Sequence, residues 1–221
     1  MKSLATLSSV AIAATLLSAT SFADGREPGS VLVYPVHQSG LGSLPQGDGG
    51  PQFTVLNVTN TNLMPAIGGE LGGTTNVQFD YVNVYYSAPP FTDKLKPILC
   101  SVNDVVAPLT PGDTYSVLTQ CKNGNNQQGY VVVHAQDPAL FKTAWSWNYL
   151  LGSELVLTPT GGVYQLDALP FEAIAEEGSL TDADGDTQLD FDDVEYEGTP
   201  DLLYIDSVLA VTGNSLVLIN L

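Results

Sequence analysis

The sequence has little positive charge. Only 6 of its 221 residues are Lys or Arg, against 24 Asp or Glu, so the formal net charge is −18. Nucleic-acid binding requires clustered Lys and Arg, and anionic membrane surfaces attract basic segments, so the composition argues against both kinds of partner. Hydrophobic residues still make up 44% of the chain and charged residues 14%. That is too apolar for a disordered acidic chain, and we expect a folded protein with a core.

Cysteine and histidine are also scarce, with two of each. Two His without a Cys-rich cluster leave little for a zinc site, and no Gly-x-Ser-x-Gly motif marks a hydrolase nucleophile. His134 alternates with valines in a predicted strand, so it is expected to be a structural partner rather than a catalytic base. We therefore expect a protein that is not an enzyme. In an oxidising compartment Cys100 and Cys121 predict one disulfide, with two buried thiols as the alternative.

Long uncharged hydrophobic runs are confined to the start of the chain. Met1-Lys2 precedes a stretch rich in Ala, Leu and Val that ends in Ser21-Phe22-Ala23. Small residues at the first and third positions of that tripeptide suit signal peptidase, so the sequence predicts a signal peptide over 1–23. A membrane anchor is the alternative reading, but Ser and Thr interrupt the stretch. We expect one secreted or periplasmic domain over 24–221, without a membrane anchor.

The rest of the chain shows strand patterns. Short runs rich in Val, Ile, Tyr and Phe are separated by Gly, Pro, Asn and Asp, which predicts strands and turns. The expected strands are residues 30–35, 53–60, 76–86, 115–118, 130–135, 143–151, 154–157, 163–166, 202–209 and 215–221, with 143–151 and 154–157 hinged near Gly152. The pattern predicts an all-β fold, an antiparallel β-sandwich, with one short helix near 170–177.

The segment FTVLNVTNTN at 53–62 resembles the strand and Thr-Asn turn of secreted bacterial immunoglobulin-like domains. The resemblance implies an immunoglobulin-like sandwich on a cell surface or in an extracellular matrix, and it brings no active site. The apolar segment 215–221 predicts a last strand. This strand either closes the sheet, or pairs with a neighbouring subunit by strand addition, or belongs to a fragment of a longer protein.

Negative charge is concentrated in the last third of the chain. Residues 143–221 contain 15 Asp or Glu and no Lys or Arg. Such crowding raises self-repulsion unless cations neutralise it. Within this region the twelve residues 182–193 place carboxylates at positions 1, 3, 5, 9 and 12, and position 7 offers a backbone carbonyl. A calcium ion takes six to eight oxygen ligands, and this spacing supplies most of them, so the sequence predicts a calcium site.

The same twelve residues resemble the calcium loops of dockerin modules and thrombospondin type 3 repeats. The resemblance implies Asp182, Asp184, Asp186, Asp190 and Asp193 as side-chain ligands and Gln188 as the main-chain ligand. Thr187 stands where such loops usually have Gly, which predicts a modest, extracellular-type affinity. Magnesium is less favoured because it retains more water, and a solvated acidic turn without an ion is the alternative.

Trp145, Trp147 and Tyr149 alternate along one predicted strand and share a face. An exposed stripe would stack on sugar rings, whereas a buried one would belong to the core, which we favour. The sequence thus predicts an exported, non-enzymatic structural or adhesive protein, braced by calcium and able to self-assemble through 215–221. The alternative is a carbohydrate-binding module or secreted hydrolase that holds a polysaccharide on the Trp145/Trp147 face.

Overall fold

The structure is a computed structural model that describes residues 27–41, 51–65, 67, 72–86, 97–124, 127–140, 142–157, 162–186 and 188–198. The predicted signal peptide over 1–23 and the predicted strands 202–209 and 215–221 lie outside these residues. No helix in the described part of the chain is both long enough and apolar enough to cross a membrane.

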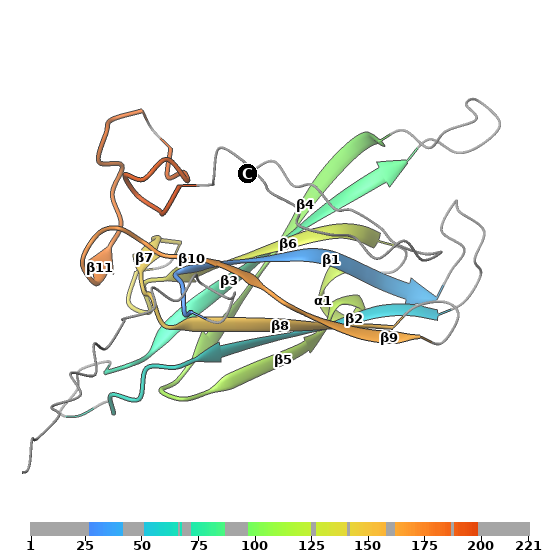
Figure 1. Cartoon of the computed structure of the whole chain (residues 1–221), viewed down its shortest axis with the longest axis horizontal. Coiled ribbons are helices and arrows are strands. Elements are labelled where there is room, and N and C mark those ends of the chain that lie inside the picture. Colours follow the sequence, from blue (N-terminus) through green and yellow to red (C-terminus); the bar gives the residue numbers. More distant parts are fainter. Residues whose placement is uncertain are drawn as a thin grey trace, which may run out of the picture.

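The described residues form strands and one short helix (Figure 1). In chain order the elements are β1 (Val31–Leu41), β2 (Pro51–Asn60), β3 (Thr75–Tyr86), β4 (Pro97–Leu109), β5 (Thr114–Leu118), α1 (Thr119–Asn123), β6 (Gln127–Gln136), β7 (Trp145–Ser146), β8 (Leu150–Leu157), β9 (Val163–Asp167), β10 (Leu169–Phe171) and β11 (Gly178–Ser179).

Nine of these strands form one antiparallel sheet. Its main path is β4-β3-β6-β1-β2-β8-β9, while β10 pairs with β1 and β5 pairs with β2. β11 and β7 form a separate two-stranded pair. The expected all-β, antiparallel fold is thus confirmed. The pairing itself does not show the two facing sheets that an immunoglobulin-like sandwich requires.

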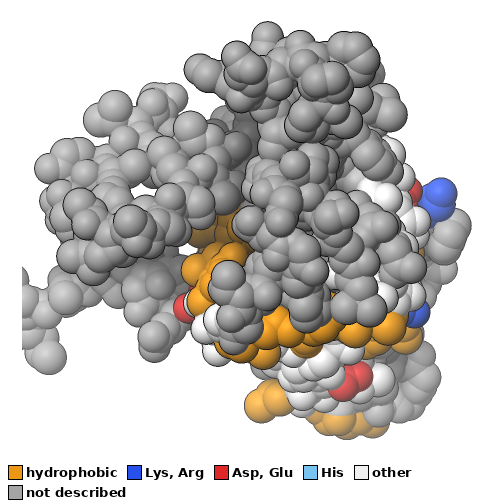
Figure 2. Space-filling view, turned by 90° about the vertical axis from the view of Figure 1, so that its right-hand side faces the viewer, with side chains coloured by type: hydrophobic (Ala, Val, Ile, Leu, Met, Phe, Trp, Pro, Cys, Tyr) orange, Lys and Arg blue, Asp and Glu red, His pale blue; other side chains and the backbone are white. Residues whose placement is uncertain are grey.

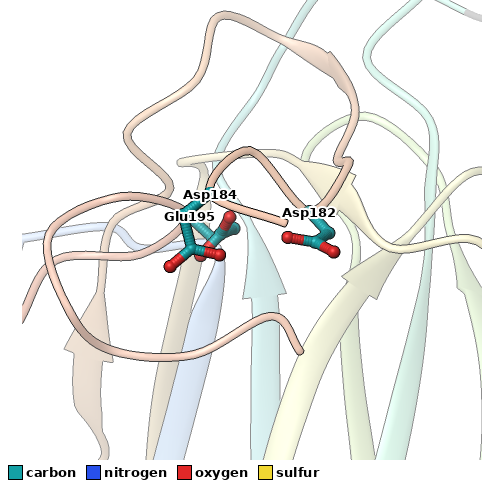
Figure 3. A group of neighbouring side chains, drawn as sticks. All are labelled: Asp182, Asp184 and Glu195. Atoms are coloured by element: carbon teal, nitrogen blue, oxygen red, sulfur yellow. The ribbon is translucent and has the colours of Figure 1, made fainter. Parts of the chain in front are cut away.

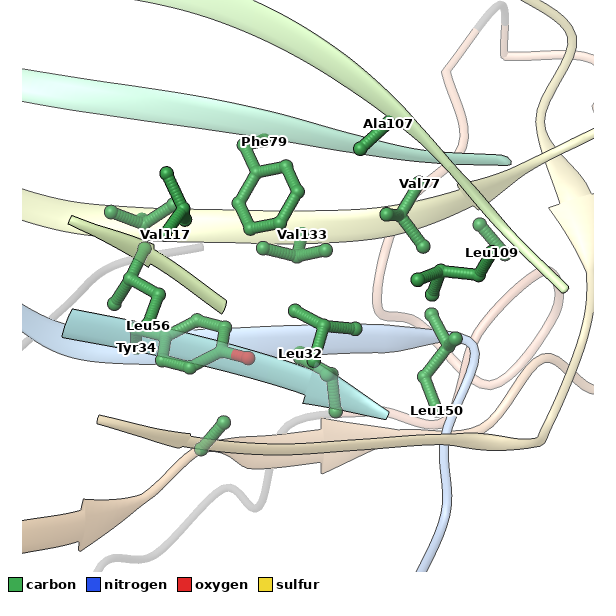
Figure 4. Close-up of a cluster of buried hydrophobic side chains, with 14 of the residues drawn as sticks. Leu32, Tyr34, Leu56, Val77, Phe79, Ala107, Leu109, Val117, Val133 and Leu150 are labelled. Atoms are coloured by element: carbon green, nitrogen blue, oxygen red, sulfur yellow. The ribbon is translucent and has the colours of Figure 1, made fainter. Parts of the chain in front are cut away.

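The core comes from strand residues with a period of two, as half-buried strands require. In β3 the buried side chains are Val77, Phe79 and Tyr81, which are paired across the sheet with Ala135, Val133 and Val131 of β6. The same cluster includes Leu32 and Tyr34 of β1, Leu56 and Val58 of β2, Val117 of β5 and Leu150 of β8 (Figure 4). Each fully buried large apolar side chain contributes about 1.5–3 kcal/mol. This cluster therefore holds the sheet together.

The helix expected near 170–177 is wrong. Leu169–Phe171 forms β10, in which Phe171 is paired with Val31 and Pro170 with Leu32 of β1. The Ser30 backbone N–H donates to the Phe171 carbonyl oxygen at 2.8 Å, so the edge of β1 gains partners that a helix would not offer. Propensity is a weak prior that tertiary pairing overrides. The short helix is instead α1, just before β6.

Two strand predictions also need correction. Gly152 is not a hinge, because β8 runs through it from Leu150 to Leu157 and the chain turns before it, at residues 147–149. A Cβ atom at Gly152 would overlap the hydroxyl group of Tyr34, so glycine is required here for packing. The 13-residue strand β4, Pro97–Leu109, was not expected, because its prolines and Asp104 obscure the alternation.

The structure does not show the predicted Cys100–Cys121 disulfide. Cys121 lies in α1 as a free, exposed cysteine. The side chain of Cys100 is outside the part of the molecule that the structure describes.

Candidate metal centre

The acidic segment, here taken as residues 182–197, is attached to the sheet by a small hydrophobic cluster. The rings of Phe171 and Phe191 lie 4.7 Å apart between centroids, and Phe191 lies 5.5 Å from Tyr196. Tyr196 is buried together with Val31 of β1 in this cluster. The Ile174 backbone N–H also donates to the Glu195 carbonyl oxygen at 3.0 Å. Phe191 and Tyr196 therefore fix the C-terminal end of the segment against β1 and β10.

Within the segment, aspartate side chains curl the backbone. The Gly185 N–H donates to Asp182 Oδ1 at 2.6 Å, and the Asp186 N–H donates to Asp184 Oδ1 at 3.0 Å. The Gln188 N–H donates in the same way to Asp186 Oδ1 at 2.8 Å. Such local side-chain to backbone bonds replace a helical or sheet ladder. Gly185 has a φ of 85°, a left-handed conformation that glycine adopts at no steric cost.

The carboxylates gather around Glu195, which is only 2% exposed. One group consists of Asp182, Asp184 and Glu195, and a second consists of Asp190, Asp192 and Glu195. In each group one ligand oxygen per residue lies within 4.8 Å of the others. Figure 3 shows the carboxylates of Asp184 and Glu195 close together and that of Asp182 turned toward them. The arrangement concentrates oxygen ligands around Glu195.

Glu195 itself is incompletely satisfied. Its Oε1 accepts a hydrogen bond from the Ala183 N–H at 2.6 Å, whereas its buried Oε2 has no hydrogen-bond partner. A buried polar atom without a partner costs about 1–3 kcal/mol, and more when it is charged. Unpaired buried groups in folded proteins call for an explanation such as an ion or water. A cation bound at Oε2 would supply the missing partner.

The electrostatics agree with such a site. A hydrogen bond from the Asp186 N–H lowers the pKa of Asp184, but desolvation and the neighbouring carboxylates of Asp186 and Glu195 outweigh it, so the net pKa is raised. Desolvation, followed by repulsion from Asp192, Asp186, Glu195 and Asp184, raises the pKa of Asp190. Like charges that share a site disfavour one another's ionised form. A divalent cation would reverse this penalty.

The structure brings together part of the ligand set predicted from the sequence. Asp182, Asp184 and Asp190 belong to the two groups, and Asp186 does not, although it lies close enough to raise the pKa of Asp190. The side chain of Gln188 is exposed, and its N–H donates to Asp186.

Asp193 is placed elsewhere. It adopts a φ of 74°, and its Oδ1 accepts a hydrogen bond from the Gly198 N–H at 2.6 Å. Asp193 therefore closes a local turn and belongs to neither group.

Sequence reasoning missed Asp192 and Glu195. The twelve-position template ends at residue 193, so Glu195 falls two positions outside it. The sequence did contain one indication that Glu195 is buried, because the apolar residue Tyr196 follows it. Tyr196 packs into the hydrophobic cluster, and Glu195 beside it is buried as well.

Two residues of the aromatic stripe lie in the core or pack against it, and the third, Tyr149, is 37% exposed. Trp147 is 1% exposed and its Nε1 donates to Asn60 Oδ1 at 3.2 Å. Trp145 is half-buried and packs against the same cluster. The two rings therefore do not form an open surface for stacking on sugars.

Four further titratable groups, His134, Asp80, His37 and Glu154, have defined surroundings. His134 Nδ1 lies 3.1 Å from Asp80 Oδ2, as expected of a structural histidine, and the hydrogen bond from His134 helps to lower the pKa of Asp80 against desolvation. Burial lowers the pKa of His37 to about 4 and raises that of Glu154 to about 8. Hydrogen bonds with the Val82 backbone and the Asn83 side chain oppose the lowering of the His37 pKa, and one with the Val36 backbone opposes the raising of the Glu154 pKa.

Comparisons with known proteins give little further guidance. No protein-family model matches the chain, and no curated protein matches its sequence. A solved structure described as "Crystal Structure of Thermotoga maritima 1070" has a TM-score of 0.37 and 11% identity, and the match covers 69% of this chain and 98% of that one. A likeness this distant supports no argument about function.

Proposed function

We propose that this protein is an exported, non-enzymatic β-sandwich protein with a structural or adhesive role at the cell surface or outside the cell, and that calcium braces its acidic segment. The observation that carries the calcium proposal is Glu195, a buried residue whose carboxylate stands among aspartates and whose Oε2 has no hydrogen-bond partner. The signal peptide that the sequence predicts at 1–23 supports the location, and a weak calcium site is typical of extracellular modules.

The chemistry of the site favours calcium over other ions. Every candidate ligand is a carboxylate oxygen, and hard cations prefer oxygen ligands, whereas zinc and copper favour sites with nitrogen or sulfur. Magnesium requires near-ideal octahedral geometry and keeps several waters. An irregular cluster of carboxylates from one curled segment suits the flexible coordination of calcium better.

Bound calcium would stabilise more than the loop. Ala183, whose N–H donates to Glu195, and Tyr196, which packs on Phe191, lie at opposite ends of the segment. A cation held by Glu195 and the aspartates would tie both ends together. Because Tyr196 is buried beside Val31, the effect reaches β1, the strand at the middle of the sheet's main path.

The exposed apolar residues support an adhesive or assembling role. β4 and β9 stand at the two ends of the sheet's main path. Val102 and Val106 of β4 and Val163, Tyr164 and Leu166 of β9 are exposed. Figure 2 shows hydrophobic side chains gathered in a band on one face. Edge strands with apolar side chains are templates for pairing with another chain, which fits the self-assembly proposed for 215–221, a segment outside the described residues.

A polysaccharide partner is a second candidate, at a place other than the tryptophans. A groove of about 490 Å³ is lined by Asn57, Thr59, Leu151, Gly152, Ser153, Gln165 and Asp167. Amides, hydroxyls and one carboxylate are groups that hydrogen-bond sugar hydroxyls. This function would be favoured if the wild type bound soluble polysaccharides and Gln165→Ala did not. If the wild type were retained equally on uncoated resin and on polysaccharide-coated resin, this function would be excluded.

Thermal melting tests the calcium proposal. The purified protein is melted in chelator and in 10 mM free calcium, at fixed ionic strength. We expect a higher melting temperature in calcium, because an ion that binds only the folded state stabilises it. An unchanged midpoint together with no heat of calcium binding in calorimetry would remove the metal from the proposal.

A further inference from the structure

The geometry points to two cation positions rather than one, and we propose that the buried carboxylate of Glu195 bridges them. This inference rests on the proposed calcium function and specifies its site. The first position lies among Asp182, Asp184 and Glu195, and the second among Asp190, Asp192 and Glu195. Glu195 is the residue common to both groups, and it is the buried one.

Distances separate the two positions. Ligands on opposite sides of one calcium ion, at about 2.3–2.6 Å from it, stand about 5 Å apart. Each group of three meets that limit, with its ligand atoms within 4.8 Å of one another, but the described carboxylates form no single group of five at the same spacing. A single ion would reach one group and leave the outer aspartates of the other without a cation.

Glu195 has the free acceptor sites that a bridge requires. A carboxylate offers about four lone-pair sites on its two oxygens. The Ala183 N–H uses one of them on Oε1, and the buried Oε2 has no hydrogen-bond partner. The remaining sites can face two ions at once, as bridging carboxylates do where two metals stand about 3.5–4 Å apart.

The charge balance of the site also indicates two bound ions. The two groups contain five carboxylates, Asp182, Asp184, Asp190, Asp192 and Glu195. One divalent cation would leave three negative charges in a small volume, whereas two would leave one. Like charges that share a site disfavour one another's ionised form, so the second ion removes repulsion that a single ion would leave.

The test measures calcium stoichiometry in the full-length protein and in paired variants. Equilibrium dialysis with radioactive calcium, in 150 mM salt and excess magnesium, gives ions bound per chain. One variant carries Asp182→Asn with Asp184→Asn, and the other carries Asp190→Asn with Asp192→Asn. A matched control, Glu176→Gln with Glu177→Gln, removes two negative charges from exposed residues outside both groups.

We expect two ions per chain in the wild type and the control, and one ion in each paired variant. Glu195→Gln is expected to reduce binding at both positions. One ion in the wild type, with all binding lost in either paired variant, would overturn the bridge and leave the calcium function standing. No binding in any form of the protein would overturn both. Circular dichroism of each variant in chelator confirms that it folds before its stoichiometry is read.

Discussion

Glu195 should have opposite effects on stability with and without calcium. In chelator its buried Oε2 has no partner, and an unpaired buried acceptor costs about 1–3 kcal/mol. Glu195→Gln keeps the shape of the side chain and removes its charge. We therefore expect the variant to melt no lower than the wild type in chelator, and below it in calcium.

The size of the calcium effect follows from linkage. For an extracellular-type site with a dissociation constant of about 0.1–1 mM, 10 mM free calcium stabilises the folded state by about 1.4–2.7 kcal/mol. A domain of about 200 residues melts about 2–4 °C higher per kcal/mol. The wild type should thus gain about 3–11 °C for each site of this affinity.

Differential scanning calorimetry of both proteins, in chelator and in calcium, gives the four melting temperatures that this reasoning requires. Glu177→Gln, an exposed change of the same chemistry, is the control and should follow the wild type. If Glu195→Gln gained as many degrees from calcium as the wild type, Glu195 would not be a ligand. If it melted far lower in chelator, its carboxylate would have a structural partner and the argument from an unpaired oxygen would fail.

Three other predictions follow from particular residues. Asp193→Asn should leave calcium stoichiometry unchanged, because Asp193 bonds the Gly198 N–H and belongs to neither group; a lost ion, measured by dialysis, would restore the ligand set predicted from the sequence. Burial raises the pKa of Glu154 from 4.5 to about 8, so the folded state binds this proton more tightly and stability should fall as pH rises through that range. When the free energy of unfolding in urea is plotted against pH, the slope for Glu154→Gln should be flatter than that of the wild type by the equivalent of about one proton. Equal slopes would contradict the assignment. Gly129→Ala should destabilise the sheet by about 1–3 kcal/mol, because a Cβ atom there would overlap the Val82 carbonyl oxygen, and an unfolding free energy like that of the wild type would show that the β3–β6 contact yields easily.

The all-β fold was predictable because its signal is local. Val77, Phe79 and Tyr81 alternate with polar residues in the sequence, and the same alternation is buried in β3. The strand at Leu169–Phe171 could not be predicted in this way. Its pairing with β1 depends on residues about 140 positions away, and the local composition of 170–177 suits a helix equally well.

The clustering of carboxylates was predictable in kind more than in detail. Asp182, Asp184 and Asp190, which the spacing of the loop singled out, belong to the acidic groups around Glu195. The closing ligand was not predictable from loop spacing, because the structure turns Asp193 toward Gly198 and brings in Glu195 through the burial of Tyr196. The packing of Tyr196 determines that Glu195 is the buried carboxylate, and a template of loop positions contains no information about such packing.

The connections of β1 have a consequence for the order of folding. β1 begins near residue 31 but pairs with β6, around residues 127–134, and with β10, around residue 170. β2 follows β1 directly and can pair with it early, but a ribosome must synthesise most of the chain before β1 can pair with β6 and β10. Pairings between distant residues close slowly, so newly made chains would remain unfolded for a relatively long time. If the chain is exported, as proposed, such a delay would help to keep it in the unfolded state that a secretion channel requires.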